Sequence, residues 1–216
     1  MSRGLLIALE GGDGAGKSVQ VDLLAQRLRQ GGLAGVDGAP DLVVTREPGG
    51  TDLGVAIRNL LLHGGQVSPV AEALLYAADR AQHVAQLIEP ALAAGAVVIT
   101  DRYVDSSLAY QAAGRGLGLD LVKQVNTLAT GGLLPDLTVL LDLPLAEATR
   151  RRAVAGQVPD RLEAAGDQFH QAVAQGYLAL AAAAPQRYAL VQAAGTPEQV
   201  HQLVWQAVAP LLQQEA

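Results

Sequence analysis

Short apolar runs alternate with longer amphipathic segments along the whole chain. The runs of strand length are Leu5–Leu9, Leu42–Thr45, Ala96–Thr100, Leu137–Leu141 and Tyr188–Val191. Each run is apolar nearly throughout, which is typical of a strand that is buried on both faces. The pattern therefore predicts a parallel sheet that is covered by helices on both sides.

The segments between these runs have the spacing of helices. They cover residues 17–30, 52–62, 69–94 with a possible break, 119–130, 145–155, 163–184 and 197–214. With right-handed crossovers, these elements predict an α/β fold with a doubly wound, five-stranded parallel sheet, in which ligands bind beyond the carboxyl ends of the strands. Residues 31–40 are rich in glycine and alanine and are expected to form a surface connection. No linker or internal repeat divides the chain, so we expect a single domain over residues 1–216.

Composition narrows the class of protein. The chain has 216 residues, 50% of them hydrophobic, which is enough for one sizeable core. No run reaches the roughly 18 apolar residues of a membrane span, and the N-terminus lacks a secretory signal pattern. The chain has no cysteine, which favours a reducing compartment, and we expect a cytoplasmic protein. The formal charge of −6 argues against binding to a nucleic-acid polymer.

A glycine-rich turn separates the first predicted strand from the first predicted helix. It consists of Gly11, Gly12, Asp13, Gly14, Ala15, Gly16, Lys17 and Ser18. This spacing is that of the P-loop, in which backbone N–H groups hold phosphates, the lysine neutralises their outer oxygens and the serine binds Mg²⁺. A tight turn with a solvated lysine is the alternative. The strand before the turn and the helix after it favour the phosphate site.

Charged residues follow the second and third predicted strands. Arg46 directly follows Leu42–Thr45, and Asp101 and Arg102 directly follow Ala96–Thr100. Forked guanidinium groups at this edge of the sheet suit a second phosphate, and a carboxylate beside a P-loop can hold Mg²⁺. Two facing phosphate sites predict the transfer of a phosphoryl group between nucleotides.

Longer motifs in the chain resemble those of the thymidylate kinase family. They are the P-loop, TREPGGT at 45–51, ALLYAADR at 73–80, DRYVDSSLAYQ at 101–111, LPDLT at 134–138 and DRLE at 160–163. They occur in the family's order and cover nearly the whole chain. The resemblance implies a P-loop kinase fold that uses ATP and Mg²⁺ to phosphorylate dTMP to dTDP in dTTP biosynthesis. It also implies a homodimer.

The resemblance implies an acceptor site for dTMP. Its residues are Asp13, Arg46, Glu47, Pro48, Arg58, Tyr76, Arg80, Arg102, Ser107, Tyr110 and Gln111. Tyr76 would stack on thymine and Arg80 would donate to a carbonyl of the base. Tyr110 would crowd the 2′ position of the sugar, Asp13 would meet the 3′-hydroxyl, and Arg102 would bind the acceptor phosphate.

Residues 150–162 resemble the mobile LID of the family, a loop that closes over ATP. Arginines in such a loop neutralise the phosphoryl group during transfer. The stretch between Arg152 and Arg161 has no basic residue, whereas family members with this kind of P-loop carry several there. Of the catalytic candidates Lys17, Arg102, Arg161 and Arg152, we expect Arg161 to act in the transition state.

Two other functions are compatible with these residues. One is a kinase for another nucleoside monophosphate or for a deoxynucleoside. The other is a nucleotide-dependent switch without catalysis. The chain lacks the Asn-Lys-x-Asp motif that reads guanine, which disfavours a GTPase.

Overall fold

A parallel sheet forms the centre of the molecule. This computed structural model describes residues 3–32, 41–155 and 160–214. The strands are β1 (Leu6–Gly11), β2 (Leu42–Arg46), β3 (Val97–Asp101), β4 (Leu137–Asp142) and β5 (Tyr188–Gln192). Their order is β2-β3-β1-β4-β5, and every neighbouring pair is parallel. The predicted fold class is confirmed, and each predicted strand overlaps an observed one.

The helices agree with the predicted segments, with one addition. They are α1 (Lys17–Arg27), α2 (Asp52–His63), α3 (Pro69–His83), α4 (Glu89–Ala93), α5 (Val104–Ser107), α6 (Leu119–Thr130), α7 (Leu145–Ala155), α8 (Asp167–Ala183) and α9 (Pro197–Gln214). Stretches with π-helical winding are η1 (Leu28–Gly32), η2 (Val84–Ile88) and η3 (Leu108–Gly114). The predicted break in 69–94 is the change of winding at η2. The addition is α5 with η3, which begins directly after β3 and was not predicted.

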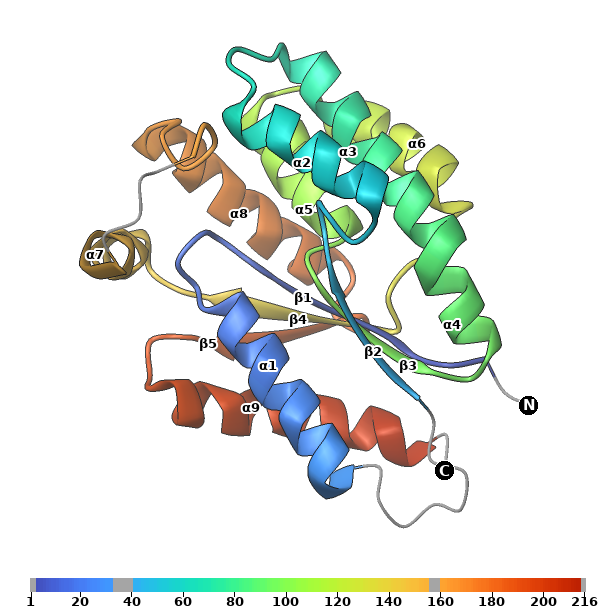
Figure 1. Cartoon of the computed structure of the whole chain (residues 1–216). Helices are drawn as coiled ribbons and strands as arrows, with labels where there is room; N and C mark the ends of the chain where they lie inside the picture. Colours follow the sequence, from blue (N-terminus) through green and yellow to red (C-terminus); the bar gives the residue numbers. More distant parts are fainter. Residues whose placement is uncertain (1–2, 33–40, 156–159, 215–216) are drawn as a thin grey trace.

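Helices cover both faces of the sheet (Figure 1). Alternate residues of β1 enter different cores, as the period of a strand requires. Ile7 and Leu9 pack against α1 and α9, and Leu6 and Ala8 pack against η2 and α4. On this second face, a further cluster joins Leu140 of β4 to η3 and α8. The sheet is thus held from both sides, and the carboxyl ends of its strands meet at one edge.

Two predicted segments fall partly outside the described residues. They are the connection 31–40, of which 33–40 is not described, and the LID 150–162, of which 156–159 is not described. Among the helices that the structure describes, none is long and apolar enough to cross a bilayer.

Candidate active site

The glycine-rich turn after β1 has the geometry of an anion site. Gly14 and Gly16 have φ values of 87° and 91°, in the region that favours glycine. The Nζ group of Lys17 donates hydrogen bonds to the carbonyl oxygens of Gly11 (3.1 Å) and Gly12 (2.9 Å). Burial and the nearby Arg102 charge lower the pKa of Lys17. A bound anion would offset this cost, because it favours the charged lysine.

A hydroxyl and a carboxylate meet beside this turn. Ser18 Oγ donates to Asp101 Oδ2 at 2.6 Å. Asp101 Oδ1 is buried and has no hydrogen-bond partner in the part of the chain that the structure describes. Such an oxygen is uncommon, and a cation bound beside it would supply the missing partner. Mg²⁺ takes oxygen ligands and needs few of them from the protein, so these two side chains fit this ion.

Arg102 projects from the end of β3 toward the turn. Its φ of 71° is the only positive value of a non-glycine residue within the described ranges. Its Nη1 donates to Ser106 Oγ (3.1 Å) and to the carbonyl of Gly11 (3.3 Å). Its Nη2 contacts the carboxylate of Asp13 and the hydroxyl of Tyr110. These contacts hold the guanidinium in place. The backbone conformation of Arg102 also depends on its surroundings, because a non-glycine residue persists in this region only where neighbouring groups fix it.

Asp13 lies on the side of the turn that faces Arg102. Its Oδ2 accepts a hydrogen bond of 2.8 Å from the Tyr110 hydroxyl. Burial raises the pKa of the Asp13 carboxyl, but the charges of Arg102 and Lys17 outweigh burial and lower this pKa to about 2. Asp13 is therefore ionised at neutral pH.

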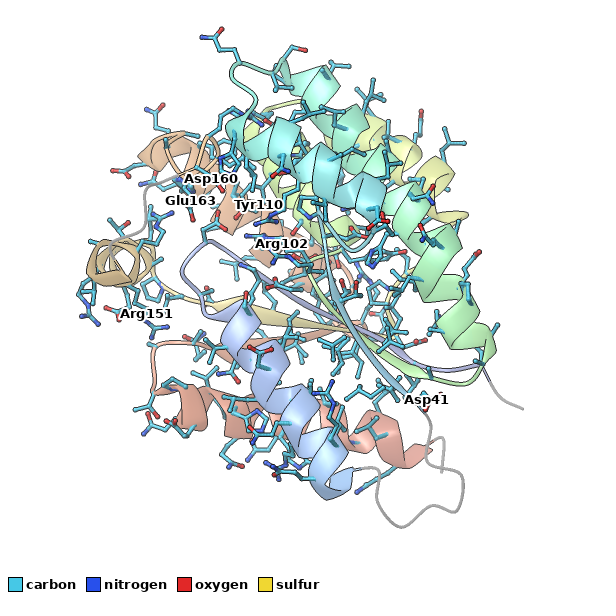
Figure 2. All side chains as sticks on the ribbon, viewed as in Figure 1. Asp41, Arg102, Tyr110, Arg151, Asp160 and Glu163 are labelled. Atoms are coloured by element: carbon cyan, nitrogen blue, oxygen red, sulfur yellow. The ribbon has the colours of Figure 1, made fainter. Side chains whose placement is uncertain are left out.

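A cavity of about 540 Å³ joins these groups at the carboxyl end of the sheet. Its volume lies in the range of small-ligand sites. The predicted residues that line it are Asp13, Gly14, Gly16, Lys17, Ser18, Arg46, Glu47, Pro48, Arg58, Tyr76, Asp101, Arg102, Ser107, Tyr110, Gln111 and Arg152. Figure 2 shows Arg102 and Tyr110 toward the middle of the molecule, near Asp160 and Glu163, which also line the cavity. Gly11, Gly12, Ala15, Arg80 and Arg161 are outside this lining.

Arg80 lies behind the cavity wall. Its guanidinium is buried and donates to Glu47 (2.8 Å), to Ser107 (2.9 Å) and to the carbonyl of Tyr103 (3.0 Å). It also contacts the side chain of Asn126. Because Glu47 and Ser107 do line the cavity, Arg80 holds two parts of the wall together.

The two catalytic candidates within the predicted LID, Arg152 and Arg161, differ in position. Arg152 lines the cavity. Arg161 points to α3 and the end of α2, where it donates to Glu72 (2.6 Å) and to the carbonyl of Leu61 (2.9 Å). The turn that carries Arg161 is closed by its neighbours, since the backbone N–H of Asp160 donates to Glu163 (3.0 Å).

Several polar residues of the site were not singled out from the sequence. They are Glu10, Glu72, Ser106 and Tyr177, together with Arg151, Asp160 and Glu163. Glu10 and Glu72 are carboxylates within largely apolar stretches and are fully buried. A buried carboxylate is rare unless it is paired, so a glutamate among apolar neighbours in the sequence could have indicated a paired, buried group.

The cavity places a turn for donor phosphates opposite arginines suited to a second phosphate, and this arrangement on a parallel sheet defines a P-loop nucleotide kinase. The sequence profile described as "Thymidylate kinase" matches residues 9–204. The chain therefore belongs to the thymidylate kinase family.

Individual relatives agree with this assignment. A thymidylate kinase from Synechococcus sp. (strain JA-2-3B'a(2-13)) is 54% identical over 208 residues, covering 96% of each chain. One from Deinococcus radiodurans is 49% identical over 209 residues, covering 96% of this chain and 98% of that one. The crystal structure of thymidylate kinase from Ehrlichia chaffeensis superposes with a TM-score of 0.74 at 31% identity, covering 98% of this chain and 99% of that one.

Proposed function

We propose that the chain transfers the γ-phosphoryl group of ATP to dTMP, giving dTDP and ADP, in dTTP biosynthesis. The family assignment supports dTMP as the acceptor. The observation that carries the proposal is a single cavity lined both by Lys17 of the P-loop and by Arg102 at the end of β3. One cavity with two phosphate-binding faces suits direct transfer, with no phosphoenzyme.

The donor and acceptor phosphates occupy different faces of the cavity. The turn of residues 11–18, with Lys17, holds the phosphates of ATP. Arg102 binds the acceptor phosphate, with Arg46 and Arg58 beside it. Burial, followed by the charges of Arg46 and Arg102, lowers the pKa of Arg58, so the charged guanidinium is disfavoured here in the absence of an anion. A phosphate dianion beside these guanidinium groups would favour their charged forms.

The nucleoside of dTMP lies between α3 and the α5–η3 segment. We assign the recognition of thymine to Tyr76, Arg80, Ser107 and Gln111. Glu47 and Pro48 form the wall of the cavity around the acceptor. Tyr76 offers a ring face for stacking. Arg80 lies behind this wall, so we assign it an indirect role, in which its Nη1 holds the Ser107 hydroxyl that lines the cavity. Asp13 accepts from the 3′-hydroxyl, and Tyr110 fills the space of a 2′-hydroxyl.

Ser18 and Asp101 would hold Mg²⁺, which supplies positive charge next to the phosphates of ATP. The unpartnered Oδ1 of Asp101 supports this assignment. Within the described ranges, no group of three or more His, Cys, Asp or Glu side chains offers a further site for a metal.

In the transfer step, an oxygen of the acceptor phosphate forms a bond to the γ-phosphorus as the bond to the β-γ bridging oxygen breaks. Phosphoryl transfer depends mainly on positioning and on charge stabilisation. Arg102 orients the attacking phosphate, and Lys17 stabilises charge on the donor side. Of the LID arginines, Arg152 and Arg161 are our candidates for binding the transferring group.

The remaining assignments concern the whole chain. We assign it as a single domain over 1–216, with a LID at 150–162, that forms a homodimer in the cytoplasm and binds no nucleic-acid polymer. Exposed leucines support the homodimer: Leu60 on α2 is 55% exposed, Leu74 on α3 is 54% exposed and Leu128 on α6 is 88% exposed. These three helices lie together above the sheet (Figure 1), so their apolar side chains can contribute to one interface.

The products of the reaction test the proposal. The purified chain is incubated with ATP, Mg²⁺ and dTMP, and the nucleotides are separated and quantified. We expect dTDP and ADP in equal amounts. ATP binding without dTDP would support a nucleotide-dependent switch, and phosphorylation of thymidine in place of dTMP would support a deoxynucleoside kinase.

A further inference from the structure

A carboxylate without a role in the proposed mechanism lies beneath the acceptor site. Glu10, near the end of β1, is fully buried. Its Oε1 accepts hydrogen bonds from the backbone N–H groups of Tyr103 (2.8 Å) and Ser106 (3.1 Å), at the start of α5. Its Oε2 accepts from the hydroxyls of Ser106 (2.6 Å) and Tyr177 (2.8 Å). All four contacts are donors, an arrangement that suits an ionised carboxylate.

The same two hydroxyls also contact Arg102. Arg102 Nη1 lies 3.1 Å from Ser106 Oγ and 3.4 Å from the Tyr177 hydroxyl. A guanidinium can only donate, so each hydroxyl must offer it a lone pair and direct its proton elsewhere. Glu10 Oε2 is within reach of both protons, and the two hydroxyls also lie 3.0 Å from each other. The charge of Glu10 thus orients two hydroxyls as acceptors for Arg102, although Glu10 does not touch Arg102 in this network.

Glu10 also restrains the backbone next to Arg102. Arg102 has a φ of 71°, and the N–H of the following residue, Tyr103, is bound by Glu10. A non-glycine residue in this region needs its neighbours to hold it. Glu10 therefore acts on both the backbone and the guanidinium of Arg102.

We propose that Glu10 is a positioning residue for Arg102, and that its ionised form holds the guanidinium ready for the acceptor phosphate. A neutral Glu10 carries a proton of its own and donates it to one of the hydroxyls. That hydroxyl then turns its own proton away from Glu10, toward Arg102 or toward the other hydroxyl 3.0 Å away, and the hydrogen bonds that hold Arg102 rearrange. The inference rests on the proposed contact between Arg102 and the phosphate of dTMP.

The charged and titratable groups around Glu10 set where this change occurs. They are Arg102 after β3, Asp105 on α5 with its partner Arg187, Tyr177 on α8, Lys17 on α1 and Tyr188 on β5. Burial and the charge of Asp105 raise the pKa of Glu10 to about 7, although Arg102 and the two hydroxyls lower it. Glu10 therefore changes charge near neutral pH, and activity with dTMP should fall as the pH drops through this range.

The test compares pH profiles of the unaltered chain and Glu10→Gln. Glutamine keeps the size of the side chain and does not ionise. We expect kcat/KM for dTMP to fall about tenfold or more at about pH 8, because Arg102 is misplaced, while KM for ATP changes by less than about twofold. We also expect Glu10→Gln to lack the loss of activity that we expect of the unaltered chain as the pH drops through about 7. The ionisation of dTMP itself affects both proteins equally, so the difference between the profiles reports Glu10.

A second variant keeps the inference testable if Glu10→Gln fails to fold. Tyr177→Phe removes one bridging hydroxyl and keeps the buried ring, and Tyr188→Phe, whose hydroxyl bonds to Arg187, is the matched control. We expect Tyr177→Phe to lower kcat/KM for dTMP by about threefold to tenfold and Tyr188→Phe to leave it unchanged.

Unchanged kcat/KM in Glu10→Gln with an unchanged pH profile, or full activity of Tyr177→Phe, would overturn the inference. Arg102→Ala is assayed in parallel. If that variant uses dTMP normally, the proposed contact of Arg102 is what fails, whereas an inactive Arg102→Ala beside an unaffected Glu10→Gln rejects the role of Glu10 alone.

Discussion

Arg161 and Glu72 form an ion pair with 2.6 Å between Nη1 and Oε2. Glu72 is fully buried on α3 and also accepts from Arg115 (3.1 Å). Arg161 is thereby tied to the helix that carries Tyr76, away from the cavity lining. To reach a phosphate it would have to leave this pair, whereas Arg152 already lines the cavity.

This difference predicts unequal effects of two substitutions. Arg152→Ala should lower kcat and kcat/KM together by about a hundredfold, because it removes charge stabilisation in the transition state. Arg161→Ala should lower the melting temperature and leave the kinetics nearly normal, because it takes a partner from a buried carboxylate. Steady-state kinetics and thermal unfolding of both variants are the measurements.

Arg150→Ala is the control, since this neighbouring side chain is 66% exposed and pairs only with Glu147 among the described residues. The sequence favours Arg161 over Arg152, because Arg161 alone lies beyond the three consecutive arginines of the LID. A larger kinetic loss in Arg161→Ala than in Arg152→Ala would support that order and would mean that the pair with Glu72 opens during the reaction.

Lys17→Ala should lower turnover by about a hundredfold or more with the fold intact, since it removes the charge over the donor phosphates. Turnover and circular dichroism are measured together. Lys123→Ala is the matched control, because Lys123 is an exposed lysine on α6 and is not part of the glycine-rich turn of residues 11–18. Normal turnover in a folded Lys17→Ala protein would contradict the phosphate site.

Tyr110 is expected to exclude ribonucleotides. Tyr110→Ala should raise kcat/KM for ribothymidine monophosphate relative to dTMP by about tenfold, because space opens at the 2′ position. Tyr110 is buried against Phe169 and Tyr177, so this variant also leaves a cavity and should melt earlier.

Tyr110→Phe separates these two effects, since it removes only the hydroxyl that donates to Asp13. It should keep most of the stability and raise the same ratio in the same direction. An unchanged ratio in both variants would assign Tyr110 to the core alone.

Asp79 predicts an unusual pH dependence of stability. Its Oδ1 accepts from the N–H of Gly49 at 3.0 Å, and its Oδ2 finds no hydrogen-bond partner in the described parts of the chain. Burial, and then the charge of Glu47, raise the pKa of Asp79 from 3.8 to about 6. The folded chain thus binds this proton more tightly than the unfolded chain, so the contribution of Asp79 to stability is greatest below pH 3.8 and is lost as the pH rises through about 6.

Asp79→Asn cannot ionise and should therefore melt a few degrees higher than the unaltered chain at about pH 8, with a difference that shrinks toward about pH 5. Thermal unfolding across this range is the measurement. The exposed Asp120, changed to Asn, is the control. A lower melting temperature of Asp79→Asn than of the unaltered chain at about pH 8 would show that the ionised carboxylate stabilises the fold.

The sheet and the phosphate turn could be predicted because their signals are local. Each strand is a compact apolar run, and residues 11–18 carry the turn, the lysine and the serine within a few positions. The start of α5 was missed because it is fixed from a distance: Glu10 on β1 caps the backbone of Tyr103 and Ser106. Spacing within 101–111 does not contain that information.

The placement of arginines is the other part that the sequence left open. Arg80 and Arg161 have the positions of ligand-binding residues in the family motifs, but each is paired with a carboxylate from elsewhere in the chain, Glu47 and Glu72. Such pairs depend on which elements the fold packs together. A motif can therefore identify the residue type that a site needs while the tertiary contacts decide where its charge lies.

The central claim is that the cavity selects dTMP as the phosphoryl acceptor. Its most direct test is a coupled assay of ADP release that compares kcat/KM for dTMP, dUMP, dCMP and thymidine under one set of conditions. We expect dTMP to be the best acceptor. The kcat/KM for dUMP should be lower by about tenfold or more, because dUMP lacks the methyl group of thymine. Equal or higher kcat/KM with another acceptor, or no ADP release with dTMP, would contradict the claim.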